Sequence, residues 1–368
     1  MSSIGARRVL ILWADSDSTN LGVQALAAGS KQLVIAAFPD CEIKFLSYST
    51  EVDRRLRPGA KNLLLASVGL NRILRGWLSS FDLVVDTGAG DSFSDIYGSR
   101  RLFEMSALRL LVRRAKVPLV MGPQTIGPFN SKIGRLLAKL SVRGAAAVFA
   151  RDSAGYRECS RVYEGSTVQA SDVAFLIPAN SNAERSGILL NVSGLLWNKN
   201  PHVDYLFYRQ QVEEFARLAI TSGLEVTLLS HVLASVNPDS DAVALRALQK
   251  NLGGVVGCFE PKDLNEVRSR IAQSEVVVAS RMHASLNALS QGVPTVAWGY
   301  SDKFRPLLTD LGWSEFYDLR GGNSNIAKDT FYVISELSNA AKAADQSRRL
   351  AVNSFNPAIV ALQEAVEK

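Results

Sequence analysis

Short apolar runs alternate with longer segments of helical periodicity along the chain. Five runs of β-branched or apolar residues occupy the first half: Arg7–Trp13, Glu42–Tyr48, Phe81–Asp86, Val117–Gly122 and Ala145–Ala150. Such runs are typical of buried parallel strands, and the segments between them are long enough to be crossover helices. The pattern predicts a parallel sheet with helices on both faces.

The alternation pauses at residues Ile177–Gly187, a polar stretch with Pro, Asn, Ser and Gly that is typical of an interdomain linker. A second series of strands follows: Gly187–Gly194, Leu224–Ser230, Gly254–Gly257, Glu275–Ser280 and Val293–Gly299. We therefore predict an α/β protein with two Rossmann-like domains, residues 1–180 and 181–345, each with a parallel sheet. A helical tail, residues 346–368, is expected to be interrupted near Pro357.

Composition supports a globular, two-domain chain and indicates its cellular compartment and the charge of its ligands. The 368 residues exceed the ~250–300 at which single cores stop growing. Cys41, Cys159 and Cys258 stand far apart, and no N-terminal apolar run has the length of a signal peptide core, so a cytoplasmic protein is expected. The net charge of +6 suits anionic ligands. Nucleic acid is not expected, because no recognition motif accompanies the charge.

Ligands of open parallel sheets bind beyond the carboxyl ends of the strands, so the residues after each strand are the candidates. The sharpest segment is Ser280–Lys303, where a strand ends directly on Arg281 and His283 and a helix begins. The guanidinium and the helix amides favour a carboxylate or phosphate. Alternatively, Arg281 ties the strand end to an aspartate and His283 caps the helix.

Only three histidines are available for proton transfer near neutral pH: His202, His231 and His283. His283 is the leading candidate because of its position at a strand end. His231 also ends a strand, although a loop histidine bonded to backbone is an equally good interpretation. His202 follows Pro201 and is expected to start a helix.

Two loops of the first half also follow strands. Asp86–Asp95 contains Gly88, Gly90 and Asp91, and its glycines would let backbone amides approach a ligand, although a plain tight turn needs them equally. In Gly122–Phe129, two Gly-Pro pairs fix a rigid loop that could present Gln124.

For two more candidates, Arg151 and Asn20, the sequence allows either a ligand-binding role or a structural one. Arg151 follows the next strand, where it could hold an anion or form a salt bridge to Asp152 or Asp172. Asn20 lies in a turn that enters a helix without a Walker lysine or a Rossmann glycine triplet, so ATP and NAD sites are not indicated.

The stretch Arg54–Leu78 mixes six cations with leucines, Ile73 and Trp77. It could rest on a membrane surface or a lipid-linked acceptor, or be a solvated basic face over core helices.

The motifs DTGAGDSF, GPQTIGPF, ARDS, SDVAFL, SRMH and GVPTVAWGYSDK occur in this order over residues 86–303. Together they resemble the polysaccharide pyruvyl transferase family, and the resemblance extends over about residues 8–320. One departure is Val23, which follows Gly22 where members often have an acidic residue.

The resemblance implies a GT-B-like arrangement, with the two domains facing across a cleft and the acceptor and donor sides in the first and second domains. It also implies phosphoenolpyruvate as co-substrate, a sugar of a surface glycan or its precursor as acceptor, and a pyruvate ketal as product. No cofactor or metal is expected, because cations can neutralise the enol phosphate. The resemblance is also compatible with association of the protein with the inner face of the plasma membrane, and with the formation of homo-oligomers.

Residue roles follow from the resemblance and the strand-end positions together. Donor binding is assigned to Arg281, Arg151, Lys303, Gly88 and Gly90. Catalytic roles are assigned to His283, Asp91 and Asp172. Acceptor binding is assigned to Asn20, Gln124 and His231.

Two other functions suit the same pattern. A GT-B glycosyltransferase would bind a nucleotide diphosphate sugar with similar loops and cations. A glycan-binding or assembly protein would retain the fold without catalysis, because fold does not fix function.

Overall fold

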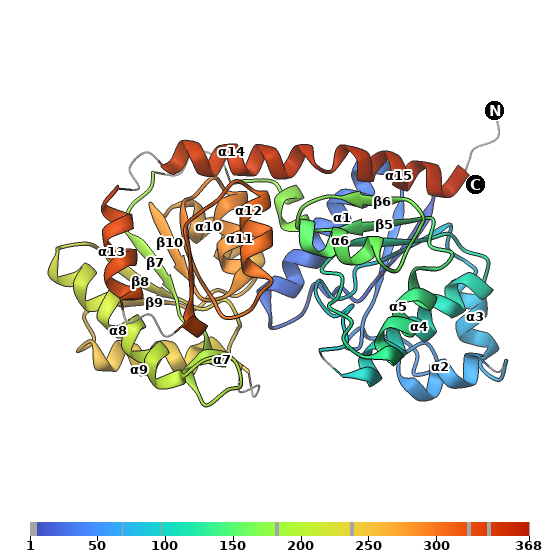
Figure 1. Ribbon diagram of the computed structural model, residues 1–368, viewed down its shortest axis with the longest axis horizontal. Helices are drawn as coiled ribbons and strands as arrows, with labels where there is room; N and C mark the ends of the chain where they lie inside the picture. Colours follow the sequence, from blue (N-terminus) through green and yellow to red (C-terminus); the bar gives the residue numbers. More distant parts are fainter. Residues whose placement is uncertain are drawn as a thin grey trace. The chain divides into compact units, whose positions relative to one another are not determined.

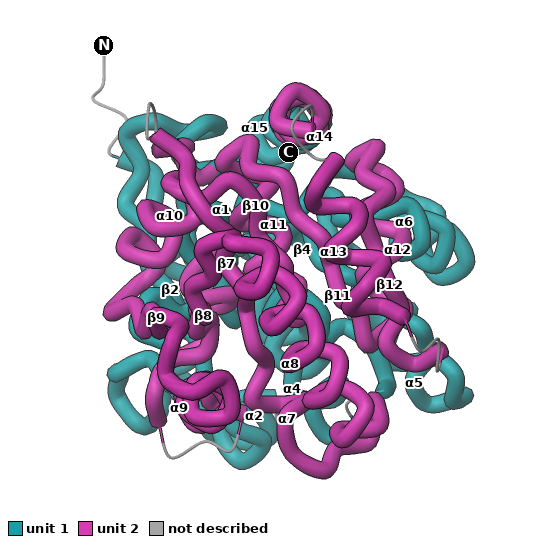
Figure 2. Tube along the Cα trace, turned by 90° about the vertical axis from the view of Figure 1, so that its left-hand side faces the viewer, with its two compact units in different colours: residues 1–18, 26–176, 351–368 teal, residues 19–25, 177–350 magenta. Residues whose placement is uncertain are grey.

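A computed structural model describes residues 6–67, 69–96, 98–180, 184–235, 239–321, 325–336 and 340–367. The chain divides into two compact units, coloured separately in Figure 2. Unit 1 comprises residues 1–18, 26–176 and 351–368, and unit 2 comprises residues 19–25 and 177–350. The division differs from the sequence-based boundaries at two places, since residues 19–25 join unit 2 and most of the helical tail joins unit 1.

Unit 1 is built on six parallel strands and the helices between them (Figure 1). Its elements are β1 (Arg8–Leu12), α1 (Leu21–Ala37), β2 (Glu42–Leu46), α2 (Ala60–Ser67), α3 (Arg72–Leu78), β3 (Leu83–Asp86), α4 (Ser99–Arg114), β4 (Leu119–Gln124), α5 (Lys132–Val142), β5 (Ala147–Ala150), α6 (Ser153–Ser160), β6 (Thr167–Gln169), a 3-10 turn (Val173–Leu176) and α15 (Asn356–Glu367). The strands β3, β4 and β5 are buried along their whole length, which is why their sequences are mainly apolar.

Unit 2 repeats the plan with six further parallel strands. Its elements are β7 (Ile188–Asn191), α7 (Gly194–Trp197), α8 (Tyr205–Thr221), β8 (Val226–Leu229), α9 (Asp241–Asn251), β9 (Gly257–Phe259), α10 (Leu264–Ala272), β10 (Val276–Ala279), α11 (Met282–Ser290), β11 (Thr295–Gly299), α12 (Phe304–Asp310), β12 (Phe316–Asp318), a 3-10 turn (Leu319–Gly321), α13 (Ile326–Glu336) and α14 (Ala340–Asn353).

Strand order locates a binding crevice in each sheet. Unit 1 has the order β2-β1-β3-β4-β5-β6, so the winding direction reverses between β1 and β3. Unit 2 has the order β9-β8-β7-β10-β11-β12, the order of Rossmann dinucleotide folds, which reverses between β7 and β10. At such a switch point the loops after two neighbouring strands diverge and leave room for a ligand. The residues that follow β1, β3, β7 and β10 are therefore the candidate ligand-binding residues.

The ten strands predicted from apolar runs are confirmed, with β9 displaced to Gly257–Phe259 from the expected Gly254–Gly257. Two strands were not predicted, β6 and β12, and each forms an edge of its sheet. Both have three residues and are only partly buried, so neither has an apolar run that distinguishes it from a loop. The expected interruption of the tail is present, because α15 begins at Asn356 with Pro357 in its first turn, where the missing N–H costs no helix bond.

Candidate functional site

The crevice of unit 2 contains Arg281, which follows β10, and Asn191, which ends β7. The backbone N–H of Arg281 donates to Oδ1 of Asn191 over 2.9 Å. Asn191 in turn donates through Nδ2 to the carbonyl of Leu229 at the end of β8. The fully buried Asn191 therefore ties three strand ends together and fixes the backbone from which the Arg281 side chain leaves.

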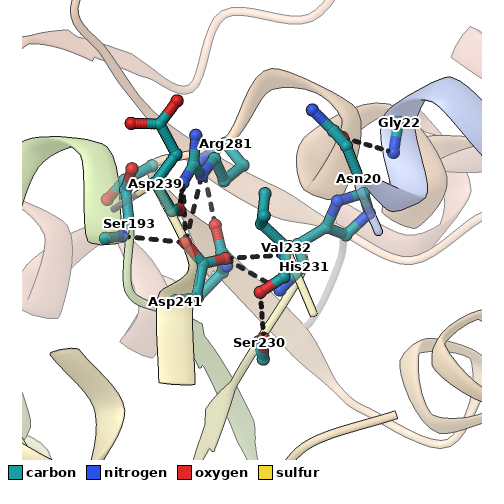
Figure 3. Close-up of polar contacts among 12 residues, drawn as sticks. Asn20, Gly22, Ser193, Ser230, His231, Val232, Asp239, Asp241 and Arg281 are labelled. Atoms are coloured by element: carbon teal, nitrogen blue, oxygen red, sulfur yellow. Dashed lines mark hydrogen bonds and ion pairs between the residues drawn. The ribbon is translucent and has the colours of Figure 1, made fainter. Parts of the chain in front are cut away.

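A buried aspartate holds the guanidinium of Arg281 (Figure 3). Nε and Nη2 donate to Oδ1 of Asp241 over 3.2 and 2.8 Å, and Nη2 also donates to the carbonyl of Asp239. Burial disfavours the charged form, but the Asp241 carboxylate outweighs it, so the pKa of Arg281 is raised. Among the described residues no acceptor bonds Nη1, and this arm of the fork remains for an anion.

Asp241 also organises the loops around it. It accepts backbone N–H bonds from Gly194 at 2.8 Å and from His231 and Val232 at 2.9 Å each (Figure 3). The carboxylate is fully buried, and five N–H groups satisfy its two oxygens. One side chain therefore sets the position of Arg281 and of the loop after β8.

His283 lies in the first turn of α11 and contacts the start of α1. A methyl group added to Gly22 would lie 2.6 Å from Nδ1 and 2.8 Å from Cγ of His283, so the imidazole packs directly on the glycine backbone. Gly22 is held in turn by Asn20, whose side-chain oxygen accepts its N–H over 2.9 Å. The absence of a side chain at position 22 makes room for the His283 ring.

His231 is 1% exposed, and two further side chains determine its tautomer. Nη1 of the buried Arg268 donates to Oδ1 of Asn287 over 2.9 Å, which leaves the Nδ2 amino group of Asn287 facing Nε2 of His231 at 3.0 Å. Because an amino group only donates, Nε2 accepts and the ring proton is on Nδ1. Burial, with the charges of His283 and Arg281, lowers the pKa of His231 to about 3. His231 is therefore a neutral hydrogen-bond donor at pH 7.

The remaining candidates of unit 2 lie around this centre. Lys303 is half-buried at the start of α12. His202, expected to start a helix, lies in a bend before α8 with its ring 5.3 Å from that of Tyr300, which follows β11. Burial lowers the pKa of His202 although Asp239 opposes the shift. His202 thus lies within electrostatic reach of both Asp239 and Lys303.

The crevice of unit 1 is closed by a buried ion pair that the sequence did not reveal. Asp86 ends β3 and accepts two bonds from Arg109 of α4, Nε to Oδ2 at 2.8 Å and Nη2 to Oδ1 at 2.9 Å. Both side chains are fully buried. Trp13 Nε1 and the backbone N–H of Gly88 complete the bonding of the carboxylate. The pair joins the ends of β1 and β3 to the helix layer.

Arg151 and Asp172 form a second buried pair in unit 1, with Nη1 and Oδ2 3.0 Å apart and side-chain exposures of 1% and 2%. Oδ1 of Asp172 also accepts the N–H of Ala174. The structure thus contains the salt bridge that the sequence offered as the alternative to donor binding by Arg151. Ligand roles for Arg151 and Asp172 stay predictions, and any such role must operate from within a paired, enclosed site.

The loop after β3 has three consecutive residues in the left-handed region, Gly88, Ala89 and Gly90. A methyl group on Gly88 would lie 1.8 Å from Oε1 of Gln124, so the glycine makes room for that amide. Gln124 is fully buried and donates to the carbonyls of Asp86 and Gly122. Its placement differs from the expected ligand-facing amide, because the rigid loop turns it inward. Asp91 is half-buried beside Ser92.

The structure sorts the predicted site residues into two groups. Unit 2 brings together Asn20, His231, Arg281 and His283, with Lys303 nearby. Unit 1 holds Gly88, Gly90, Asp91, Gln124, Arg151 and Asp172. Among the described residues, no cluster of three or more His, Cys, Asp or Glu side chains has the arrangement of a metal site.

Sequence reasoning missed Asn191, Asp241, Asn287, Arg268, Asp86 and Arg109 as site residues. Asp86 ends a predicted strand, so the strand-end argument would have found it. Asn191 ends β7 but lies inside the predicted strand Gly187–Gly194, so the argument passed over it. Asp241 and Asn287 give no such signal, because their partners lie 40 and 56 residues away in the chain.

Each of the two units has a sheet of six parallel strands with a crevice at its switch point, which is the architecture of the GT-B fold class. Solved structures agree. UDP-N-acetylglucosamine 2-epimerase from Neisseria meningitidis, bound to UDP-GlcNAc, is similar with a TM-score of 0.59 at 12% identity, covering 97% of this chain and 100% of that one. HepE of Anabaena in complex with UDP-glucose gives a TM-score of 0.56 at 12% identity, covering 98% of each chain. At such identities the likeness concerns the fold.

The sequence comparisons define the family. A family model described as polysaccharide pyruvyl transferase matches residues 20–302. The chain belongs to the polysaccharide pyruvyl transferase family. The amylovoran biosynthesis protein AmsJ of Erwinia amylovora is 25% identical over 261 residues, which cover 65% of this chain and 61% of that protein. The predicted family is thereby confirmed.

Proposed function

We propose that the chain transfers the pyruvyl group of phosphoenolpyruvate to two hydroxyls of one sugar in a surface polysaccharide or its precursor. The product is a pyruvate ketal, and phosphate is released. The proposal depends mainly on one observation, the guanidinium of Arg281 held by Asp241 at the switch point of unit 2 beside His283. Family membership supports the reaction class, since the family is that of the polysaccharide pyruvyl transferases.

The reaction needs few functional groups. The methylene carbon of the enol phosphate takes up a proton, the first sugar hydroxyl bonds to the carbon that carries the phosphate, and the second hydroxyl bonds there as phosphate leaves. Two hydroxyl protons are lost, one balancing the new methyl group and one leaving with phosphate. The protein must bind a carboxylate and a phosphate, supply a proton and receive one.

The residues of unit 2 match these tasks. Arg281 offers the Nη1 arm to the donor anion, and the N-terminal turn of α11 begins beside it. His283 carries the proton transfer to the methylene carbon in this proposal. His231 cannot do so at neutral pH, because its pKa of about 3 keeps it neutral. It donates a hydrogen bond through Nδ1 instead, and Lys303 adds positive charge.

Phosphoenolpyruvate is expected to stabilise the purified chain, whereas UDP and UDP-glucose are not. A ligand bound only by the folded state adds about 2.7 kcal/mol at a concentration of a hundred times its dissociation constant. Thermal melting with each ligand measures the shift. The nucleotides belong in the experiment because solved structures of the same fold contain UDP-sugars. Stabilisation by UDP alone would favour a glycosyltransferase over the proposed reaction.

Turnover then separates a transferase from a glycan-binding protein. The chain is incubated with phosphoenolpyruvate and a panel of hexose oligosaccharides, while phosphate release and ketal formation are followed together. Phosphate and ketal in equal amounts support the proposal. Glycan binding without consumption of phosphoenolpyruvate would contradict it.

Gly22→Ala is expected to lower kcat about a hundredfold while leaving the fold intact. The added methyl group occupies the space of the His283 ring and forces it to turn, and a displacement of about 1 Å at a catalytic group costs a factor of this size. With three histidines in the chain, NMR of the imidazole C–H groups reports the moved ring directly.

Gly76→Ala provides the matched control for Gly22→Ala. Gly76 also lies in a helix, α3, and a methyl group there meets nothing within 4 Å. It is expected to leave both the His283 resonance and kcat unchanged. An unaltered His283 signal in Gly22→Ala would contradict the packing argument, whereas a moved ring with full activity would contradict the role of His283.

A further inference from the structure

Unit 1 exposes an apolar stripe to solvent on α5 and α4. Ile133, Leu136 and Leu140 follow one another at helical spacing on α5 and are 63%, 57% and 51% exposed. Phe103 and Leu110, two turns apart on α4, are 46% and 40% exposed. Scattered exposed apolar residues are ordinary, but five on two helices that contact each other are typical of an interaction surface.

The two stripes lie on the same side of the sheet. The helices α4 and α5 connect β3 to β4 and β4 to β5, so consecutive right-handed crossovers place both on one face. The two helices lie side by side in Figure 1. A buried bond of 2.7 Å joins the hydroxyls of Ser141 and Ser106. On α4, Phe103 and Leu110 lie one turn before and one turn after Ser106 and therefore flank the contact with α5. Both stripes face solvent, as their exposed fractions show.

The side-chain charges on α5 and on the exposed side of α4 are positive, and one carboxylate, Asp95, bonds Ser131 at the start of α5. On α5, Lys132, Arg135 and Lys139 are exposed and no acidic residue occurs between Lys132 and Val142. On α4, five arginines accompany a single acid, Glu104, and one of the five, Arg109, is fully buried. Glu104 is 5% exposed and accepts bonds from Tyr48 at 2.6 Å and from Arg100. We name the apolar residues Phe103, Leu110, Ile133, Leu136 and Leu140, with these cations, the basic apolar face.

We propose that the basic apolar face binds the surface of an anionic lipid bilayer. Leucine, isoleucine and phenylalanine side chains enter the boundary between head groups and acyl chains, while lysines and arginines contact the lipid phosphates. In the described residues no helix has the length and apolar character needed to cross a bilayer, so the contact is peripheral. The inference is independent of the proposed reaction, because lipid binding is measured without substrate.

Exposed apolar residues and cations also occur together on α3 and in the turn before it. Leu70, in the turn before α3, is 75% exposed, and Ile73 on α3 is 43% exposed. A cavity of about 610 Å³ beside them is lined by Arg72, Arg75 and other residues that include two further cations, Arg114 and Lys116. Both α2 and α3 contact α4. Exposed Leu70 and Ile73 beside a cavity lined by cations suit a lipid with an anionic head group.

Other partners fit these observations less well. A second copy of the chain would bring identical positive surfaces together, and like charges oppose such a symmetric contact. Nucleic acid would bond the cations but leave Ile133, Leu136 and Leu140 in water. An anionic bilayer is the occupant that uses both the charges and the apolar stripe.

The full chain is to be sedimented with vesicles of phosphatidylcholine alone and of phosphatidylcholine mixed with phosphatidylglycerol. We expect binding to the anionic vesicles only, weakening as salt rises. Ile133→Gln with Leu136→Gln removes apolar contact without changing charge, and is expected to lower the partition coefficient about tenfold or more. The triple change of Lys132, Arg135 and Lys139 to Gln is expected to lower it about a hundredfold, at roughly fivefold for each charge.

Matched controls come from exposed positions in unit 2. Leu206→Gln with Val243→Gln removes two apolar side chains of 59% and 66% exposure. Changing Lys250, Lys262 and Lys328 to Gln removes three exposed charges. Both variants are expected to bind vesicles nearly as the unchanged chain does, and melting temperatures verify that every variant is folded.

Three results would overturn the proposal. The first is no binding to phosphatidylglycerol vesicles at low salt. The second is binding that the Ile133 and Leu136 changes leave intact, which indicates a polyanion site rather than a bilayer contact. The third is a dimer in sedimentation velocity that those changes dissociate, which assigns the face to a second copy.

Discussion

We expect Arg281→Ala to lower kcat/KM for the proposed donor, phosphoenolpyruvate, about a hundred- to thousandfold, the usual cost of removing a positioned, charge-assisted donor from an active site. The loss appears mainly in KM for the donor if Nη1 binds its carboxylate or phosphate equally before and during the reaction. The fold is expected to survive, because the Asp241 carboxylate keeps three backbone donors, those of Gly194, His231 and Val232. Phosphate release at varied donor concentration measures both parameters.

Arg246→Ala is the control for this effect. Arg246 lies in the same unit on α9 and also pairs with a carboxylate, Glu260, but at an exposed position near the edge strand β9. Its removal is expected to leave kcat/KM unchanged. Arg281→Lys tests geometry, since it keeps the charge but cannot bond Asp241 and a ligand with one planar fork. Near-normal donor KM in both Arg281 variants would exclude Arg281 from the donor site.

The strands of the fold could be predicted because burial leaves a record in local sequence. β3, β5, β7 and β10 are buried along their whole length. β5 and β10 are apolar throughout, and β3 and β7 are apolar up to their last residues, Asp86 and Asn191. The edge strands β6 and β12 have one neighbour each and only partial burial, so no run distinguishes them. The assignment of residues 19–25 to unit 2 depends on pairing between Asn20 and Val232, a long-range contact that has no local signature.

The candidate site was predictable to the extent that strand ends define it. Arg281 and His283 follow β10 directly, and the rule that ligands bind at carboxyl ends of strands found both. The rule does not say which way a side chain turns. Gln124 also ends a strand, yet it bonds backbone carbonyls within the core. Asp241, which orients Arg281, comes from α9, and Asn287, which bonds His231 of another loop, comes from α11, so both contacts require the folded chain.

Buried charge occurs at both switch points, with different consequences. Asp241 in unit 2 leaves one arm of Arg281 available, and the Arg281 side chain retains 11% exposure. In unit 1, Asp86 and Arg109 have none. A pair with no exposure cannot reach a ligand without rearrangement, so we assign the pair in unit 1 to stability and positioning, and Arg281 to binding.

Arg109→Met is accordingly expected to destabilise unit 1 by about 3–5 kcal/mol, the cost of leaving a buried charge without its partner. The Asp86 carboxylate would keep only Trp13 Nε1 and the N–H of Gly88. The guanidinium also stacks over Phe93, 4.3 Å from the ring centre, and methionine retains part of that contact. Urea unfolding followed by hydrogen exchange of β3 and β4 amides measures the loss within unit 1.

The double variant Asp86→Leu, Arg109→Met decides whether the ion pair itself is the cause. If the unpaired charge accounts for the loss, the double variant is less destabilised than the sum of the two single variants by at least about 1 kcal/mol. Arg100→Met on the same helix is the control, because its pair with Glu104 is largely exposed on the arginine side and contributes about 0.5 kcal/mol or less. Additive losses would mean that packing around α4, and not the buried charge, determines the stability of unit 1.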